Sequence, residues 1–179
     1  MRFVLVDRLL TLDLAPDAGK SIVMVKNVSM AEEYLSDHFP GFPVLPGVFM
    51  LEAAAQAAAW LVRVATDFSS SLVVLKSVRQ ARYGAFVSPG NTLVLRAELL
   101  DLSATAATLK VRGEVDGAPA LQARIVLAQI NLAATEPHLA EMDRHMIAGL
   151  RRQWALFTQH AETKTPDLVA PPRIAPALP

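Results

Sequence analysis

Residues 48–66 constrain the fold of this chain more than any other segment. They include no glycine or proline, are dominated by alanine, with leucine, valine and methionine among the rest, and are apolar around almost the whole circumference of a helix. Such a segment favours an α-helix, and a helix without a polar face must be covered on most sides. We therefore expect one central helix, entered through residues 38–47, where three prolines and two glycines prevent regular structure.

Strand-like segments flank this helix on both sides. Runs rich in valine, isoleucine and leucine precede it at 3–14 and 21–28, and further runs follow at 72–83, 92–102, 105–115 and 118–131. Turn sequences separate the later runs, and the Asp-Gly pair at 116–117 favours a tight hairpin. The pattern predicts an α+β fold in which an antiparallel sheet, a meander in its second half, wraps around the central helix. A short polar helix is expected at 31–36.

The C-terminal part of the chain has a different pattern. From residue 136 onward, apolar side chains recur at spacings of three and four, which predicts an amphipathic helix whose apolar stripe packs on the rest of the protein or on a neighbour. After about residue 163 the chain is rich in proline. We expect a main domain at 1–131, the amphipathic helix within 132–163, and an extended or disordered tail at 164–179.

Composition narrows the possible functions. Seventeen basic and seventeen acidic side chains give no net charge, which argues against nucleic acid as a partner. Without cysteine there is no disulfide, thiolate metal site or thiol nucleophile, so catalysis must use oxygen and imidazole groups. A hydrophobic content of 53% with only 19% charged residues indicates either oligomerisation or an apolar cavity.

Two apolar segments need to be distinguished from targeting or membrane sequences. Asp7 and Arg8 interrupt the N-terminal apolar run before it reaches the length of a secretory core. The central helix contains Glu52, Gln56 and Arg63 among many alanines, which contribute little to membrane insertion. We expect a buried helix of a cytoplasmic protein and no membrane span.

The polar residues near the start of the central helix could perform chemistry. Glu52 lies just over one turn into the apolar helix, and Gln56 follows at i+4 on the same face. A buried carboxylate must be paired, neutralised or exposed to a cavity, although both side chains could instead satisfy backbone amides of a loop. His38 can act as a base near neutral pH, and the free N–H groups at Gly47 can stabilise a negative oxygen.

The segment 37–56, Asp-His-Phe-Pro-Gly-Phe-Pro-Val-Leu-Pro-Gly-Val-Phe-Met-Leu-Glu-Ala-Ala-Ala-Gln, resembles the signature of the 3-hydroxyacyl-[acyl carrier protein] dehydratases, which have the hot-dog fold. The resemblance comprises His-Phe-Pro-Gly, Pro-Val-x-Pro-Gly, an acidic residue fourteen positions after the histidine and a glutamine four further on. It extends over about residues 1–131. Glutamate rather than aspartate at position 52 resembles the branch that dehydrates without isomerising the double bond.

The resemblance implies a role for each matched residue. His38 would remove the C2 proton of a (3R)-3-hydroxyacyl thioester, Glu52 would assist departure of the 3-hydroxyl group as water, and the Gly47 N–H would polarise the thioester carbonyl. The product would be the trans-2-enoyl thioester, formed without a metal or other cofactor. Further residues implied in substrate binding are Phe39, Pro46, Val48 and Gln56.

The resemblance also implies partners. The acyl chain would be carried by acyl carrier protein or by coenzyme A, and a homodimer, alone or within a trimer of dimers, would build each site from two subunits. The basic residues Lys76, Arg79 and Arg82 are candidates for docking an acidic carrier, although such a run is usually only a solvated face. Two alternatives are another hot-dog enzyme, such as a thioesterase or a coenzyme A hydratase, and a non-catalytic acyl-binding subunit.

Overall fold

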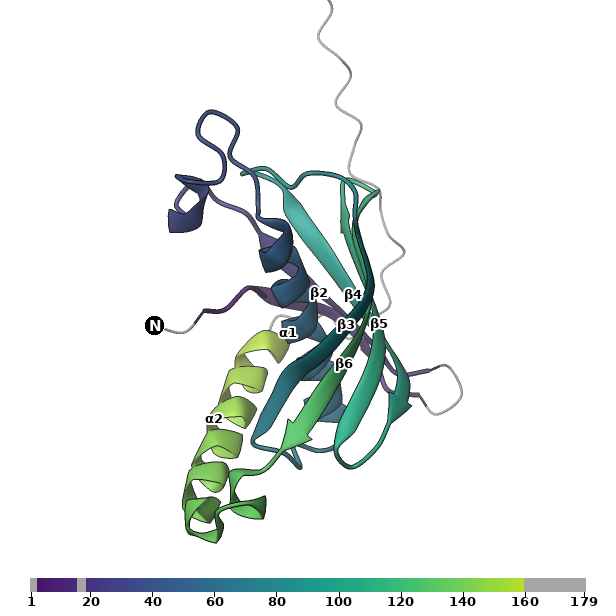
Figure 1. Ribbon diagram of the computed structural model, residues 1–179, viewed down its shortest axis with the longest axis vertical. Helices are drawn as coiled ribbons and strands as arrows, with labels where there is room; N and C mark the ends of the chain where they lie inside the picture. Colours follow the sequence, from purple (N-terminus) through teal and green to yellow (C-terminus); the bar gives the residue numbers. More distant parts are fainter. Residues whose placement is uncertain (1–2, 16–18, 160–179) are drawn as a thin grey trace, which may run out of the picture.

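The computed structural model describes residues 3–15 and 19–159, which form one antiparallel sheet, two long helices and three short 3-10 turns (Figure 1). The predicted tail at 164–179 lies outside these residues. The strands are β1 (Arg8–Asp13), β2 (Ser21–Asn27), β3 (Leu72–Tyr83), β4 (Thr92–Leu102), β5 (Ala106–Val115) and β6 (Ala118–Ile130); the helices are α1 (Gly47–Ala65) and α2 (Ala140–Thr158); the 3-10 turns are η1 (Glu33–Leu35), η2 (Leu132–Ala134) and η3 (Pro137–Leu139).

The strand order in the sheet is β1-β2-β4-β5-β6-β3, so the predicted meander holds only for β4, β5 and β6. β3 does not pair with β4, which follows it in sequence, but lies at the opposite edge beside β6. The chain after β3 continues this pairing, because the Gly84 N–H donates to the Ala120 carbonyl and the Ala85 N–H to the Pro119 carbonyl. β4 can then pair with β2, which brings the two halves of the chain into one sheet.

The first predicted strand is shorter than expected. Residues 3–7 run outside the ladder, and β1 begins only at Arg8. The Asp7 N–H still donates to the Val25 carbonyl of β2 at 2.8 Å, but the Leu5 N–H donates to a side chain of α1, at 2.9 Å from Oε1 of Gln56. The polar helix predicted at 31–36 is likewise reduced to the single turn η1.

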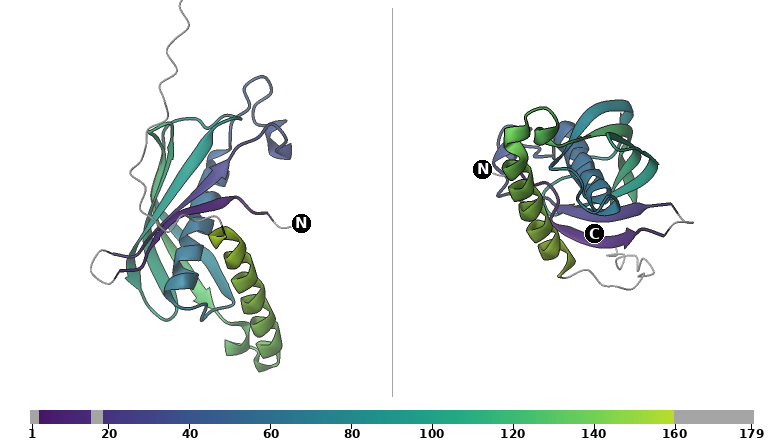
Figure 2. Two further views of the ribbon diagram at one scale, coloured as in Figure 1. Left: turned by 180° about the vertical axis from the view of Figure 1, so that it is seen from behind. Right: turned by 90° about the horizontal axis from the view of Figure 1, so that it is seen from below.

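α1 is the central helix predicted from the sequence, and the sheet curves around it (Figures 1 and 2). One face consists largely of fully buried alanines, whose small side chains allow the helix to lie close to the strands. Leu and Ile side chains from the inner face of the sheet complete this core, each contributing about 1.5–3 kcal/mol of burial free energy. Within the described residues, α1 is the one helix long and apolar enough to cross a membrane, and over half of its most apolar window is buried inside the protein.

α2 lies beside α1, on the side that the sheet leaves open (Figure 2). The Trp154 ring stacks on the Trp60 ring of α1 at 5.7 Å, and Phe157 meets Trp60 edge-on at 5.3 Å. Asp143 anchors the other end of α2 by accepting hydrogen bonds from the Ser71 hydroxyl and from two backbone N–H groups of η2. These hydrogen bonds hold the pKa of Asp143 below its ordinary value, and the bond from the Ser71 hydroxyl has the largest effect. The apolar stripe thus packs on the chain's own body.

Candidate active site

The loop before α1 presents His38 on a short, hydrogen-bonded turn. Phe39 and Phe42 exchange backbone hydrogen bonds, and Gly41 between them has a φ of +83°, a conformation that favours glycine. The His38 carbonyl accepts a hydrogen bond from the Val44 N–H at 3.0 Å. The imidazole is half-buried and stacks on the Phe39 ring at 4.2 Å, and it has no hydrogen-bond partner among the described residues.

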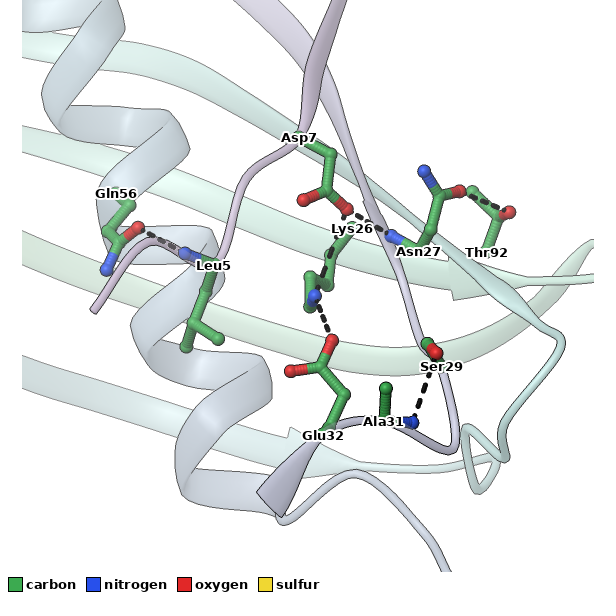
Figure 3. A network of polar contacts seen from close by, with 9 residues as sticks. All are labelled: Leu5, Asp7, Lys26, Asn27, Ser29, Ala31, Glu32, Gln56 and Thr92. Atoms are coloured by element: carbon green, nitrogen blue, oxygen red, sulfur yellow. Dashed lines mark hydrogen bonds and ion pairs between the residues drawn. The ribbon is translucent and has the colours of Figure 1, made fainter. Parts of the chain in front are cut away.

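A buried ion pair fastens the segment that leads to His38 (Figure 3). Lys26 of β2 is buried, and its Nζ lies 2.5 Å from Oε1 of Glu32 and 3.9 Å from a carboxylate oxygen of Asp7. Glu32 immediately precedes η1, six residues before His38. Burial and the neighbouring Glu32 charge raise the pKa of Tyr34 in the same turn, so its hydroxyl stays protonated. Breaking such a pair is costly because it leaves an uncompensated charge. The Lys26–Glu32 pair therefore anchors the loop.

The start of α1 offers free N–H groups next to this loop. Pro46 occupies the position before the helix and provides no side-chain cap, and among the described residues the N–H groups of Gly47 and Val48 have no acceptor. A Cβ on residue 47 would lie 3.1 Å from the Tyr83 ring, so glycine allows β3 to approach the helix start. The first N–H groups of a helix carry partial positive charge and suit a developing oxyanion.

Glu52 is half-buried rather than enclosed, because its face of α1 borders a groove. One carboxylate oxygen accepts a hydrogen bond from Nε2 of Gln56 at 2.8 Å. Gln56 is itself fixed by the backbone, since it accepts from the Leu5 N–H (Figure 3) and also donates to the Phe3 carbonyl. The structural interpretation therefore holds for Gln56, which satisfies loop backbone, whereas Glu52 accepts a hydrogen bond only from Gln56 among the described residues and borders the groove.

The groove beside Glu52 has a volume of about 410 Å³. Its floor is the face of α1 that includes Glu52, Ala55, Gln56 and Ala59, and its walls come from β3, β6, the N-terminal segment and α2. His38, Phe39, Pro46 and Val48 do not line it. Within one chain, Glu52 and Gln56 thus lie together, whereas the histidine belongs to a different face.

The Glu52 groove is also lined by residues to which the sequence had assigned no functional role. Arg63 and Trp60 of α1, with Leu150 and Gln153 of α2, line the far end of the Glu52 groove. Arg63 follows Glu52 by eleven positions, or about three helical turns, and this spacing could have indicated that both side chains lie on one face of the helix. The contribution of α2 carried no such signal, because it depends on tertiary packing.

The predicted docking residues Lys76, Arg79 and Arg82 are all exposed on β3. Arg82 lines a second, smaller hollow of about 220 Å³ on the sheet, together with Lys110 of β5 and Arg124 of β6. Arg79 is paired with Arg124, and Arg124 with Lys110, so like charges stand directly opposite each other across three strands. This basic cluster could not be recognised from local sequence, since its members come from separate strands.

Among the described residues, no three His, Asp or Glu side chains are grouped as metal ligands. The predicted surface histidines His138 and His145 are exposed, and His160 lies outside the described residues.

An antiparallel sheet that wraps around one long central helix is the architecture of the hot-dog class of fold. The dehydratase heterocomplex ApeI:P from Xenorhabdus doucetiae has a TM-score of 0.60 with this chain at 20% identity, covering 76% of this chain and 90% of that one. The putative thioesterase yhdA from Lactococcus lactis has a TM-score of 0.56 at 13% identity, covering 69% and 94%. At these identities the likeness concerns the fold alone.

Sequence comparison identifies the family. A family model described as a FabA-like domain matches residues 1–124. The 3-hydroxyacyl-[acyl-carrier-protein] dehydratase FabZ of Albidiferax ferrireducens is 41% identical over 134 residues, covering 73% of this chain and 87% of the relative. The FabZ of Ruminiclostridium cellulolyticum is 38% identical over 126 residues, covering 70% and 86%. The chain therefore belongs to the FabA-like family.

Proposed function

We propose that this protein dehydrates (3R)-3-hydroxyacyl-[acyl carrier protein] to the trans-2-enoyl thioester in fatty-acid or related acyl-chain synthesis. The observation that carries the proposal is Glu52, oriented by Gln56 in a groove that its neighbours leave open. Both of the curated relatives named above, at 38% and 41% identity, bear the name of this activity. Residues 1–131 would form the catalytic unit, which agrees with the extent of the family match.

The reaction needs a base, an acid and an oxyanion donor. The imidazole of His38 takes the C2 proton, and the electron pair of that bond forms the C2–C3 double bond. The C3–O bond breaks while the Glu52 carboxyl group, as general acid, delivers a proton to the hydroxyl group, which leaves as water. The Gly47 N–H stabilises the negative charge that develops on the thioester oxygen. A positioned acid or base contributes about 10²- to 10⁴-fold to such a step.

A second copy of the chain would bring the two catalytic groups together. Three observations support this: His38 does not line the Glu52 groove of its own chain, β3 is an edge strand, and several large apolar side chains near the His38 loop are exposed. These exposed residues are Phe39, Phe42, Val48, Tyr83 and Phe86. We propose a homodimer in the cytoplasm, with each site built from His38 of one protomer and Glu52 of its partner and with Phe39, Pro46 and Val48 beside the thioester.

Mixing two inactive variants tests this arrangement. His38→Ala and Glu52→Gln should each lower turnover about 10²- to 10⁴-fold, measured by the ultraviolet absorbance of the enoyl product. When the two are unfolded and refolded together in equal amounts, mixed dimers regain one intact site, which should restore about a quarter of the wild-type activity. No recovery in dimers shown to be mixed would contradict a shared site, and full activity of His38→Ala would contradict the mechanism.

The basic cluster on the sheet supports docking of an acidic carrier. Like charges placed opposite each other in a sheet destabilise it, so a partner that neutralises Arg79, Arg124 and Lys110 would be stabilising. The double variant Arg79→Gln/Arg82→Gln should raise KM for the carrier-bound substrate and leave KM for a pantetheine thioester unchanged. An equal effect on both substrates would place the cluster outside carrier recognition.

A thioesterase is the second candidate, since several solved structures with this fold bear that name. The same incubation distinguishes the two activities, because a thioesterase releases free thiol and a dehydratase does not.

A further inference from the structure

The groove that holds Glu52 extends along α1 to a second ionisable residue, Arg63. Glu52, Gln56, Ala59 and Arg63 follow one another on the same face of the helix, at spacings of three and four. Eleven residues of helix separate Glu52 from Arg63, which corresponds to about 16 Å along the axis. An acyl chain whose C3 atom lies at Glu52 would therefore point its far end toward Arg63.

Arg63 lacks the partners that a charged group in such a position ordinarily has. Its Nε is buried without an acceptor among residues 3–15 and 19–159, and no ion pair to its guanidinium occurs in that part of the chain. The guanidinium lies 5.1 Å from the centre of the Trp60 ring, and burial lowers its pKa to about 10. It remains cationic at neutral pH. An unsatisfied buried donor is destabilising, so a molecule that supplies an acceptor would be bound there.

α2 closes the groove at this end. Leu150 and Gln153 line the groove from α2, and the Trp154–Trp60 stack holds α2 against α1. α2 lies outside residues 1–124, which match the family model. The end of the groove thus combines the Arg63 cation, the Gln153 amide and the Trp60 ring, whereas a purely hydrocarbon chain would require only apolar walls.

We propose that Arg63, assisted by Gln153, binds a carboxylate at the distal end of the acyl chain, so that the preferred substrates are 3-hydroxyacyl thioesters with a terminal carboxylate. This inference rests on the proposed dehydratase function and names its substrate class. A methyl-terminated chain would leave the guanidinium desolvated and unpartnered, whereas a carboxylate would form a charge-assisted hydrogen bond with it.

Matched pairs of substrates test the proposal. Each pair of 3-hydroxyacyl pantetheine thioesters has the same chain length and ends in either a methyl or a carboxylate group, and kcat/KM is measured for both. At the best-fitting length the wild type should favour the carboxylate by about 10- to 100-fold, the range of one charge-assisted hydrogen bond. Arg63→Met should abolish this preference and retain turnover of the methyl-terminated substrate. Gln153→Leu should reduce the preference, and Arg152→Met, which removes an exposed charge from α2, should not change it.

The outcomes separate the two hypotheses. If the wild type dehydrates no thioester, the proposed function fails. If it dehydrates methyl-terminated chains without any preference for the carboxylate, the dehydratase stands and the role of Arg63 is refuted. If Arg63 only packs on Trp60, Arg63→Met should lower the melting temperature without changing the substrate ratio. If Arg63 instead contacts a second protomer, Arg63→Met should change the oligomeric mass without changing the substrate ratio. The wild-type ratio and Gln153→Leu decide the question even if Arg63→Met does not fold.

Discussion

Gln56 fastens the N-terminal segment to the catalytic helix, and replacing it with leucine should affect stability and activity together. Its amide makes three hydrogen bonds: it accepts from the Leu5 N–H, and it donates to the Phe3 carbonyl and to Glu52. Leucine has a similar size and no hydrogen-bonding group, so Gln56→Leu removes all three bonds with little change in volume.

The magnitude follows from the burial of each partner. Leu5 is only 2% exposed, so water cannot replace the lost acceptor at its N–H, and an unsatisfied buried donor costs about 1–3 kcal/mol. Phe3 is 53% exposed, and Glu52 borders the groove, so both can bond to water instead. We expect the free energy of unfolding to fall by about 2 kcal/mol. Since Glu52 also loses the donor that orients it, kcat should fall while KM changes little.

Urea unfolding measures this change in the free energy of unfolding. All variants are compared at one protein concentration, because the stability of a dimer depends on concentration. Gln122→Leu on the exposed surface of β6 is the control for the same substitution, and its free energy of unfolding should change by less than about 0.5 kcal/mol. If Gln56→Leu unfolds at the same urea concentration as the wild type and keeps full kcat, the three hydrogen bonds of Gln56 contribute neither to stability nor to catalysis.

Further predictions concern the His38 loop, α2 and the close approach of Gly84 to Pro119. Lys26→Met breaks the buried pair with Glu32 and should lower the free energy of unfolding by about 3 kcal/mol; Glu32→Gln, which keeps a hydrogen-bond acceptor, should lose less in the same urea assay, and equal losses would contradict the ion pair. The pKa of Asp143 is depressed in the folded state, so its stabilising effect is complete above the unfolded value of about 3.9 and is lost as pH falls through the folded value. The stability difference between the wild type and Asp143→Asn should therefore shrink as unfolding is measured below about pH 4, and a constant difference from pH 7 to pH 2 would refute it. Gly84→Ala should be strongly destabilising in thermal unfolding, because the added Cβ would lie 2.2 Å from the Pro119 carbonyl oxygen; an unchanged melting temperature would show that the backbone yields easily.

The proposed site was accessible to sequence reasoning only where it is local. His38, Gly47 and Glu52 lie within fifteen residues, and their spacing on a loop and a helix start is set by the chain itself. Arg63, Leu150 and Gln153 meet through the packing of α2 on α1, which no local pattern encodes. The same applies to Arg124 and Lys110, which join Arg82 only because β3 pairs with β6.

The sequence by itself determined the elements of this protein. A glycine-free apolar stretch produced the central helix, and alternating β-branched runs separated by turn residues produced the strands, because these preferences act between neighbours along the chain. Only the tertiary structure decided the order of the strands, the attachment of Leu5 to Gln56, and the closure of the Glu52 groove by α2. These features depend on contacts between segments distant in sequence, whose free energies become favourable only when the whole core has formed.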